Sequence, residues 1–178
     1  VSFLEEHPEV GVLGTWVANI DERGQPTSIW QPPTSPTLVR WTMLFSNPLA
    51  HPSVMMRRSL VEGGMAYRPE ILYGQDYDLW ARLSVKTQLA NLPEFLCLRR
   101  VHERMLTTQR YRQQRKTGRV VKQRIFSNLL GEEIPEALIT AFARARREEL
   151  LETETELRAV ANLIKRLCQA YSIRIKLG

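Results

Sequence analysis

Long apolar segments and cysteine are both scarce in this sequence, and each shortage excludes a class of protein. No segment approaches the ~20 consecutive apolar residues of a membrane-spanning helix, and no signal peptide is visible. The two cysteines, Cys97 and Cys168, are too far apart for a zinc site and too few for a disulfide framework. We therefore expect two small buried thiols in a reducing compartment. The predicted location is the cytoplasm, with peripheral attachment to the inner face of the membrane left open.

The sequence also lacks an initial methionine. It begins Val1-Ser-Phe-Leu-Glu-Glu, a pattern typical of the end of a helix. The strands that we predict below are fewer than the ~5–6 of an average sheet. Both observations lead us to expect a fragment, with half of its sheet encoded upstream of Val1.

The residues that are present indicate a globular body with a helical extension. Of the 178 residues, 43% are hydrophobic and 25% are charged, which is ordinary for a folded domain. Residues 1–102 hold 9 Lys/Arg against 10 Asp/Glu, whereas residues 103–178 hold 16 against 9. A near-neutral body followed by a basic segment indicates two units with different roles.

Strand-like and helix-like segments alternate over the first hundred residues, which is the order of an α/β fold. Residues 10–20 are apolar almost without interruption, so we expect a strand that is covered on both faces. Ser59 is expected to cap a short helix that ends at Gly63 and Gly64. The remaining predicted elements are strands at 53–57 and 94–101 and helices at 37–45 and 76–86.

Every pattern after residue 107 is helical. Val121, Ile125 and Leu129 form an apolar stripe on a helix predicted at 108–130. Gly131 is expected to end this helix, and Pro135 to lie in the first turn of the next one.

The last predicted helix runs to about residue 170 and carries a seven-residue repeat. Its members are Leu150, Leu157, Ile164 and Tyr171, with Val160 and Leu167 three residues later in their heptads. Two interpretations stay open, because three heptads are near the minimum for a coiled coil. The helix dimerises, or it packs on a neighbouring helix of its own chain.

Residues 73–83 place two carboxylates, Asp76 and Asp78, at a loop-to-helix junction behind Gly74. Free backbone N–H groups at a helix start favour negative charge. Helix capping explains such residues without any chemistry, and Asp76 is then the N-cap. A carboxylate held at this position is equally suited to act as a base.

Three segments occur in an order that resembles a known family. They are Asn-Pro-Leu-Ala-His-Pro-Ser-Val-Met-Met-Arg-Arg from residue 47, Gly-Gln-Asp-Tyr-Asp-Leu-Trp-Ala-Arg-Leu from residue 74 and Leu-Pro-Glu-Phe-Leu-Cys-Leu-Arg-Arg-Val-His-Glu from residue 92. Together they resemble the C-terminal half of a bacterial family-two glycosyltransferase with the GT-A fold. The resemblance implies a partial, Rossmann-like mixed sheet in residues 1–106, on the acceptor and base side, followed by an all-helical extension at 107–178.

The resemblance implies roles for five residues of this half. Asp76 corresponds to the general base of an inverting transfer, and Gln75 stands where the family usually has a glutamate. Gln75 can bind a hydroxyl by hydrogen bonds but cannot accept its proton. His51, Tyr73 and Trp80 are expected on the acceptor side, with packing as the alternative for His51 and Trp80.

The resemblance also implies a divalent cation, Mn²⁺ or Mg²⁺, in the full-length enzyme. A histidine near the position of His102 helps to bind it in similar proteins. Asp76 and Asp78 are not the Asp-x-Asp motif of the family, because that motif precedes this region and follows a strand. We therefore expect that the fragment lacks the donor site, binds no metal tightly and is inactive alone.

The expected partners are a nucleotide-sugar donor and a glycan or lipid-linked acceptor, in the synthesis of cell-envelope or exported polysaccharide. Residues 103–124 hold eight Lys/Arg and one acid, which suits an anionic membrane surface or a solvated helix face. Nucleic acid is an unlikely partner, because no binding module accompanies the charge. The alternative function is a non-catalytic interaction module whose helical tail dimerises or docks a partner.

Overall fold

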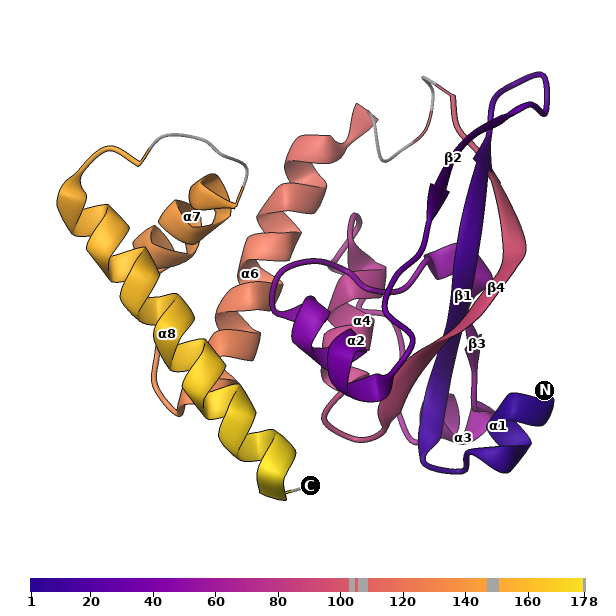
Figure 1. The fold of residues 1–178 in the computed structure, drawn as a ribbon, viewed down its shortest axis with the longest axis horizontal. Helices are drawn as coiled ribbons and strands as arrows, with labels where there is room; N and C mark the ends of the chain where they lie inside the picture. Colours follow the sequence, from indigo (N-terminus) through magenta and orange to yellow (C-terminus); the bar gives the residue numbers. More distant parts are fainter. Residues whose placement is uncertain (103–104, 106–108, 147–150, 178) are drawn as a thin grey trace. The chain divides into compact units, whose positions relative to one another are not determined.

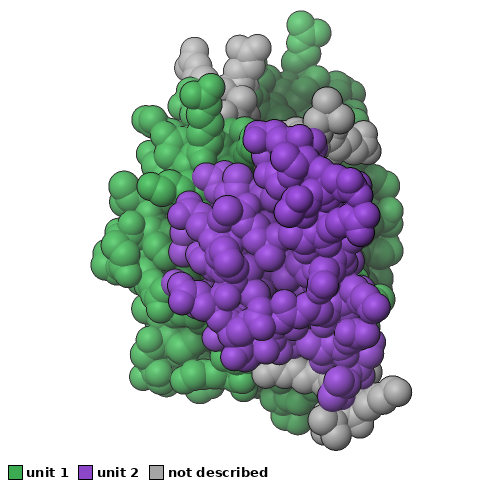
Figure 2. Space-filling view, turned by 90° about the vertical axis from the view of Figure 1, so that its left-hand side faces the viewer, with its two compact units in different colours: residues 1–117 green, residues 118–178 purple. Residues whose placement is uncertain are grey.

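The computed structural model of the chain describes residues 1–102, 105, 109–146 and 151–177. The chain divides into two compact units, residues 1–117 and residues 118–178 (Figure 2). The first unit is mixed α/β and the second is helical. The predicted fold class, a partial Rossmann-like mixed sheet followed by helices, is therefore confirmed.

The sheet of the first unit is built around one long strand (Figure 1). This strand, β1 (Val10–Ile20), pairs in parallel with β4 (Gln88–Arg100) on one side. On its other side it pairs antiparallel with β2 (Pro26–Trp30) near its end and with β3 (Met55–Met56) near its start. The first six residues of β1 are buried, as expected for a strand that is covered on both faces.

Three strands differ from their predicted extents. β2 was not predicted, and β3 covers only two residues of the predicted 53–57 segment. β4 begins six residues before the predicted strand at 94, because Pro93 does not interrupt it. The register against β1 shifts between the partners of Leu92 and Phe95, so the proline lies in an irregularity where no ladder N–H is required.

The helices of the first unit are short. They are α1 (Ser2–Glu6), α2 (Pro36–Met43), the 3₁₀ turn η1 (His51–Ser53), α3 (Arg58–Glu62) and α4 (Gln75–Leu83), and α2 and α4 lie on one side of the sheet (Figure 1). The predicted cap of α3 is wrong: Ser59 lies inside the helix, and the N-cap position belongs to Arg57 with no side-chain cap. α3 does end at Gly63 as predicted.

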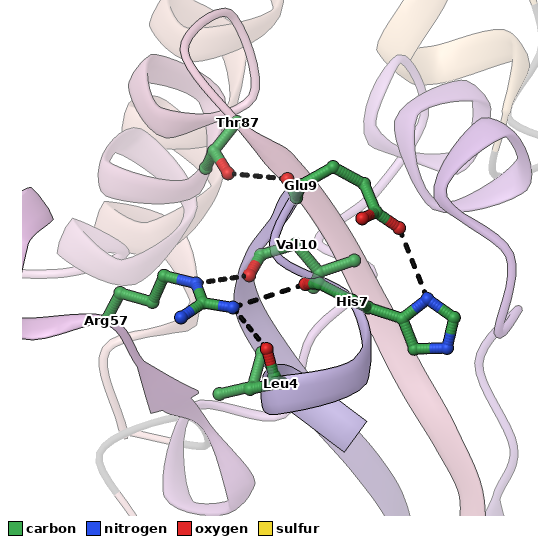
Figure 3. Close-up of polar contacts among 6 residues, drawn as sticks. All are labelled: Leu4, His7, Glu9, Val10, Arg57 and Thr87. Atoms are coloured by element: carbon green, nitrogen blue, oxygen red, sulfur yellow. Dashed lines mark hydrogen bonds and ion pairs between the residues drawn. The ribbon is translucent and has the colours of Figure 1, made fainter. Parts of the chain in front are cut away.

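Arg57 instead ties the start of β1 to α1 (Figure 3). Its Nε donates to the carbonyl of Val10 at 2.9 Å, and one terminal nitrogen donates to the carbonyls of His7, at 3.2 Å, and Leu4. These carbonyls lie at or beyond the C-terminal end of α1, where a cation also complements the helix dipole. Arg57 is thus a structural residue rather than part of an anion site.

Helix α6 (Tyr111–Leu130) begins in the first unit and continues into the second, which also holds α7 (Glu136–Ala145) and α8 (Glu154–Leu177). In the second unit, Phe126 contacts Phe142 edge-on, with 5.2 Å between the ring centroids. The predicted stripe on α6 is only partly right, because Ile125 and Leu129 are half-buried whereas Phe126 is buried. Pro135 is the N-cap of α7, one position before its first turn.

Helix α8 buries one apolar face and exposes another. Val160, Leu163 and Leu167 are buried, and α8 packs beside α7. Two heptad members face outward: Leu157 is 57% exposed and Ile164 is 39% exposed. Packing on a neighbouring helix therefore accounts for the buried face, and dimerisation through the exposed face stays a prediction. Leu150 lies outside the described residues.

The expectation of two buried cysteines is wrong for Cys168, which is exposed, while Cys97 is half-buried. Cys168 lies on the exposed face of α8 and not on the buried one. Within the described ranges, every helix is too short or too polar to cross a membrane.

Candidate functional site

Gly74 sets the start of the candidate site. Its φ of 75° lies in the left-handed region that favours glycine, and it occupies the N-cap position of α4. Asp76 is consequently the second residue of the helix, and the N-cap reading of Asp76 is wrong. It still lies in the first turn, where backbone N–H groups stabilise negative charge.

Asp78 has a different environment from Asp76. It is 1% exposed, and its carboxylate accepts from Arg82 Nε at 2.9 Å and from Arg68 at 3.5 Å. Arg82 also donates to the carbonyl of Ala66 at 2.7 Å. Asp78 therefore anchors the loop before α4 through Arg82 and Arg68.

The carboxylate of Asp76 is half-buried and is held by an amide. Asn47 Nδ2 donates to Asp76 Oδ2 at 2.8 Å. In the described part of the chain, no hydrogen bond reaches the second oxygen, Oδ1. Nearby, the hydroxyl of Tyr77 donates to the carbonyl of Met43 at 2.5 Å, which fixes α4 against the end of α2. The carboxylate thus has one restrained oxygen and one available oxygen.

Tyr67 lies within the electrostatic influence of this carboxylate, and His51 contacts Tyr67. The hydroxyl of Tyr67 lies 2.8 Å from His51 Nε2, and the two rings meet edge-on. Burial raises the pKa of the Tyr67 hydroxyl, and the negative charge of Asp76 raises it further. Tyr67 therefore stays protonated at neutral pH and can donate a hydrogen bond.

Trp80 lies 6.3 Å from the His51 ring, measured between centroids, and is 1% exposed. It therefore packs behind His51 and offers no surface to a sugar ring. Its Nε1 is buried without a hydrogen-bond partner in the described residues. Packing was the alternative that the sequence left open for Trp80, and the burial favours that alternative.

Tyr73 and Gln75 flank Gly74 and are both half-buried. The guanidinium of Arg110 lies over the Tyr73 ring, 5.7 Å from its centroid. A cation on the face of a tyrosine is a favourable contact, so one face of Tyr73 is already occupied. The acceptor-side roles of Tyr73 and Gln75 stay predictions.

His102 lies two residues beyond β4, where its carbonyl accepts from Met105 N–H at 3.1 Å. Among the described residues, no hydrogen bond or ion pair joins it to Asp76, His51 or Tyr67. Within the ranges that the structure describes, no group of three or more His, Cys, Asp or Glu could hold a metal ion. A single imidazole does not make such a site, so the metal role of His102 stays a prediction and we derive no step through a metal.

The sequence did not identify two members of this cluster, Asn47 and Tyr67. Asn47 precedes Pro48 in one of the segments that carry the family resemblance, and the Asn-Pro pair indicated only a turn. Tyr67 lies in an irregular loop with no local pattern. Asn47 reaches Asp76 from 29 positions away, and Tyr67 lies close enough to be influenced by its charge through an irregular loop; neither relation follows from a spacing pattern along the chain.

The cluster can accept a proton from a hydroxyl. A carboxylate with one available oxygen is the base that such a transfer requires, and the nearby tyrosine and histidine are hydrogen-bonding groups that could orient the hydroxyl. Comparison with known proteins points to glycosyltransferases.

The chain is 32% identical over 111 residues to the amylovoran biosynthesis glycosyltransferase AmsE of Erwinia amylovora, covering 62% of this chain and 41% of that protein. It is 25% identical over 131 residues to an uncharacterized glycosyltransferase of Haemophilus influenzae, covering 68% of this chain and 41% of that protein. No family model matches the chain. The chain thus spans about two fifths of these relatives, and the likeness supports a glycosyltransferase relationship.

Proposed function

We propose that this chain carries the base and acceptor side of an inverting glycosyltransferase of the GT-A type that acts in polysaccharide synthesis. The reaction transfers a sugar from a nucleotide-diphosphate sugar to an acceptor hydroxyl. The observation that carries the proposal is the Asp76 carboxylate, held through Oδ2 by Asn47 and available at Oδ1. The similarity to two glycosyltransferases supports the reaction class.

In the proposed reaction, Asp76 accepts the proton of the acceptor hydroxyl. The acceptor oxygen forms a bond to the anomeric carbon, while the bond from that carbon to the diphosphate breaks and its electron pair leaves with the diphosphate. Attack from the face opposite the leaving group inverts the configuration. Gln75, at the first position of α4, can bind a neighbouring hydroxyl of the acceptor without taking part in proton transfer.

Tyr67 and His51 are suited to orient the acceptor beside this base. Both side chains are exposed, and their hydrogen bond leaves the tyrosine oxygen as a possible acceptor and the imidazole as a possible donor. Sugars present both kinds of group on each hydroxyl. The proposed acceptor is a glycan or a lipid-linked glycan.

The donor side is proposed to lie outside the described residues. As expected from the sequence, we infer that the chain alone is inactive, and that the divalent cation of the full-length enzyme depends on further ligands. We also propose peripheral action at the inner face of the membrane. The exposed side chains of Arg110, Arg112 and Lys116, at the start of α6, would meet anionic lipid there.

The decisive variant is Asp76→Asn in the complete protein. Removing the base should lower kcat by at least about a hundredfold with the fold intact, since general-base catalysis contributes roughly 10²–10⁴. The measurement is nucleoside diphosphate release from uridine and guanosine diphosphate sugars, with a membrane fraction as the source of acceptor. Glu62→Gln removes an exposed carboxylate of the same unit and should leave the rate unchanged. If the Asp76→Asn protein kept its transfer activity, Asp76 would not be the general base.

A second candidate function, self-association through α8, rests on a different observation. Leu157, Ala161, Ile164 and Cys168 are exposed at helical spacing on a face adjacent to the buried residues Val160, Leu163 and Leu167. A second copy would bury these apolar side chains, because a seven-residue repeat such as that of Leu157 and Ile164 is typical of helices that pair, and we propose it as the occupant of this face.

A further inference from the structure

We infer that Asn47 is the positioning residue of the base: it holds one oxygen of the Asp76 carboxylate so that the other faces the acceptor hydroxyl. The inference rests on the proposed function and adds a role that the sequence did not indicate. It follows from how the two ends of the Asn47 amide are used.

The amide of Asn47 is fixed in one orientation by its own turn. Its Oδ1 accepts from the backbone N–H of Leu49 at 3.2 Å. The opposite end of the amide, the Nδ2 donor, is therefore the one that points to Asp76 Oδ2 at 2.8 Å. An amide whose acceptor end is engaged in this way cannot rotate to present its oxygen to the carboxylate without losing the Leu49 bond.

The turn that carries Asn47 is itself held in place by a buried residue of β4. Leu49 is 2% exposed, and Pro48 between them is buried. The Nδ2 of Asn91, a buried residue of β4, donates to the carbonyl of Pro48 at 3.1 Å and to that of Pro33 at 2.8 Å. A supporting layer of this kind is what keeps a reactive group within a narrow range of positions.

Among the described residues, Asn47 is the one whose side chain donates a hydrogen bond directly to Asp76. Tyr67, from the loop before α4, senses the charge of Asp76, and His51 of η1 bonds to Tyr67 rather than to the carboxylate. The neighbouring cations Arg68 and Arg82 are engaged by Asp78. Loss of the Asn47 donor therefore disfavours the charged carboxylate and frees its rotation.

The variant that isolates this role is Asn47→Asp in the complete protein. Aspartate is nearly isosteric and keeps the acceptor for Leu49 N–H, so the turn is retained. It removes the donor and places a second carboxylate against Asp76. We expect kcat to fall roughly 10- to 100-fold with little change in KM, because Asp76 loses a hydrogen bond to its charged form and gains a like charge beside it. The acidic limb of the rate profile should move to higher pH.

Asn19→Asp is the matched control. Asn19 is also a buried amide with both ends bonded, to Ser28 Oγ at 2.8 Å and to Arg99 Nε at 2.9 Å, and the sequence change is the same. Its charge is placed beside Arg99, away from the cluster. We expect kcat and the pH profile of this variant to match those of the unaltered protein.

A double variant keeps the inference testable if Asn47→Asp is poorly folded. If Asn47 acts through Asp76, then Asn47→Ala lowers the residual rate of an Asp76→Asn protein no further, whereas a purely structural role gives an additive loss. If Asp76→Asn is inactive but Asn47→Asp leaves the pH profile unchanged, the inference is wrong and the proposed function is unaffected. The same conclusion follows if the rate losses of Asp76→Asn and Asn47→Ala are additive. An active Asp76→Asn protein would instead overturn the proposed function.

Discussion

Asp76 and Asp78 are two residues apart on α4 and yet have opposite environments. At 3.6 residues per turn, positions i and i+2 of a helix point about 200° apart, so one faces inward when the other faces the site. Asp78 is accordingly 1% exposed between two arginines, while Asp76 is half-buried against Asn47. The family resemblance implied a catalytic role for Asp76 alone, and that role stays a prediction, whereas the opposite orientations follow from helical spacing, which is local information. The partners of Asp76 were not predictable in the same way, since Asn47 lies 29 positions away.

Tyr67 provides a test of this geometry that needs no substrate. Its pKa is raised by burial first and by the charge of Asp76 second. We expect Asp76→Asn to lower the Tyr67 pKa toward its ordinary value of 10.0 without restoring it fully, because the burial remains. An absorbance titration of tyrosinate measures this, with Tyr67→Phe identifying the signal among the five tyrosines.

The same group predicts a change in stability at high pH. A pKa raised in the folded state means that the folded protein keeps a proton that the unfolded chain loses above pH 10.0. The contribution of Tyr67 is therefore fully present below that pH and is lost as the pH rises through the folded pKa. Tyr67→Phe should lose less stability than the unaltered protein over this range. An equal loss in both proteins would contradict the raised pKa of Tyr67 in the folded protein.

At the level of elements, local patterns predicted β1 and most helices, and failed where pairing partners are distant. β1 was predicted with its observed bounds because continuous apolarity over 11 residues is a strong local pattern. The extent of β4 was not, because its first residues are stabilised by pairing with β1 almost 80 positions earlier. Pro93 indicated a break in the strand. The irregular pairing with β1 accommodates the proline, so β4 continues through it.

Gly14 shows how such a pairing supports the site. It faces Asn91 across the β1–β4 pair, and a Cβ on Gly14 would lie 2.2 Å from Asn91 Oδ1 and 3.0 Å from Leu49. Asn91 cannot easily withdraw, because its amide holds Pro33 and Pro48. We expect Gly14→Ala to destabilise the protein by about 1–3 kcal/mol, as overpacking does.

Urea denaturation measures this effect, and Gly118→Ala is the matched control. Gly118 lies in α6, where the nearest contact of an added Cβ is the mobile end of Lys122 at 3.7 Å. Alanine there should stabilise the helix by up to about 1 kcal/mol. Equal stabilities for the two variants would show that Asn91 does not constrain Gly14.

At the scale of the whole molecule, the two units have separate proposed roles. The proposed base, Asn47, Tyr67 and His51 all belong to residues 1–117, the unit with the mixed sheet. The helical unit contributes none of them, and its seven-residue repeat was ambiguous in the sequence. The structure divides that repeat, because Val160 and Leu167 are buried within the chain while Leu157 and Ile164 are exposed. Only the exposed members of the repeat, Leu157 and Ile164, are available to contact a second copy of the chain.

Self-association is therefore tested on the exposed half alone. We expect light scattering of the 178-residue chain to give twice the mass of one copy, and the double variant Leu157→Ser, Ile164→Ser to give the mass of one. Both changes lie on the exposed face of α8 and leave its buried residues unchanged, so the helical unit should stay folded. Val85→Ser removes an apolar side chain that is 67% exposed elsewhere and should not alter the mass. A monomeric unaltered chain would rule out α8 as an interface between copies and leave the transferase assignment unaffected, since the two rest on different residues.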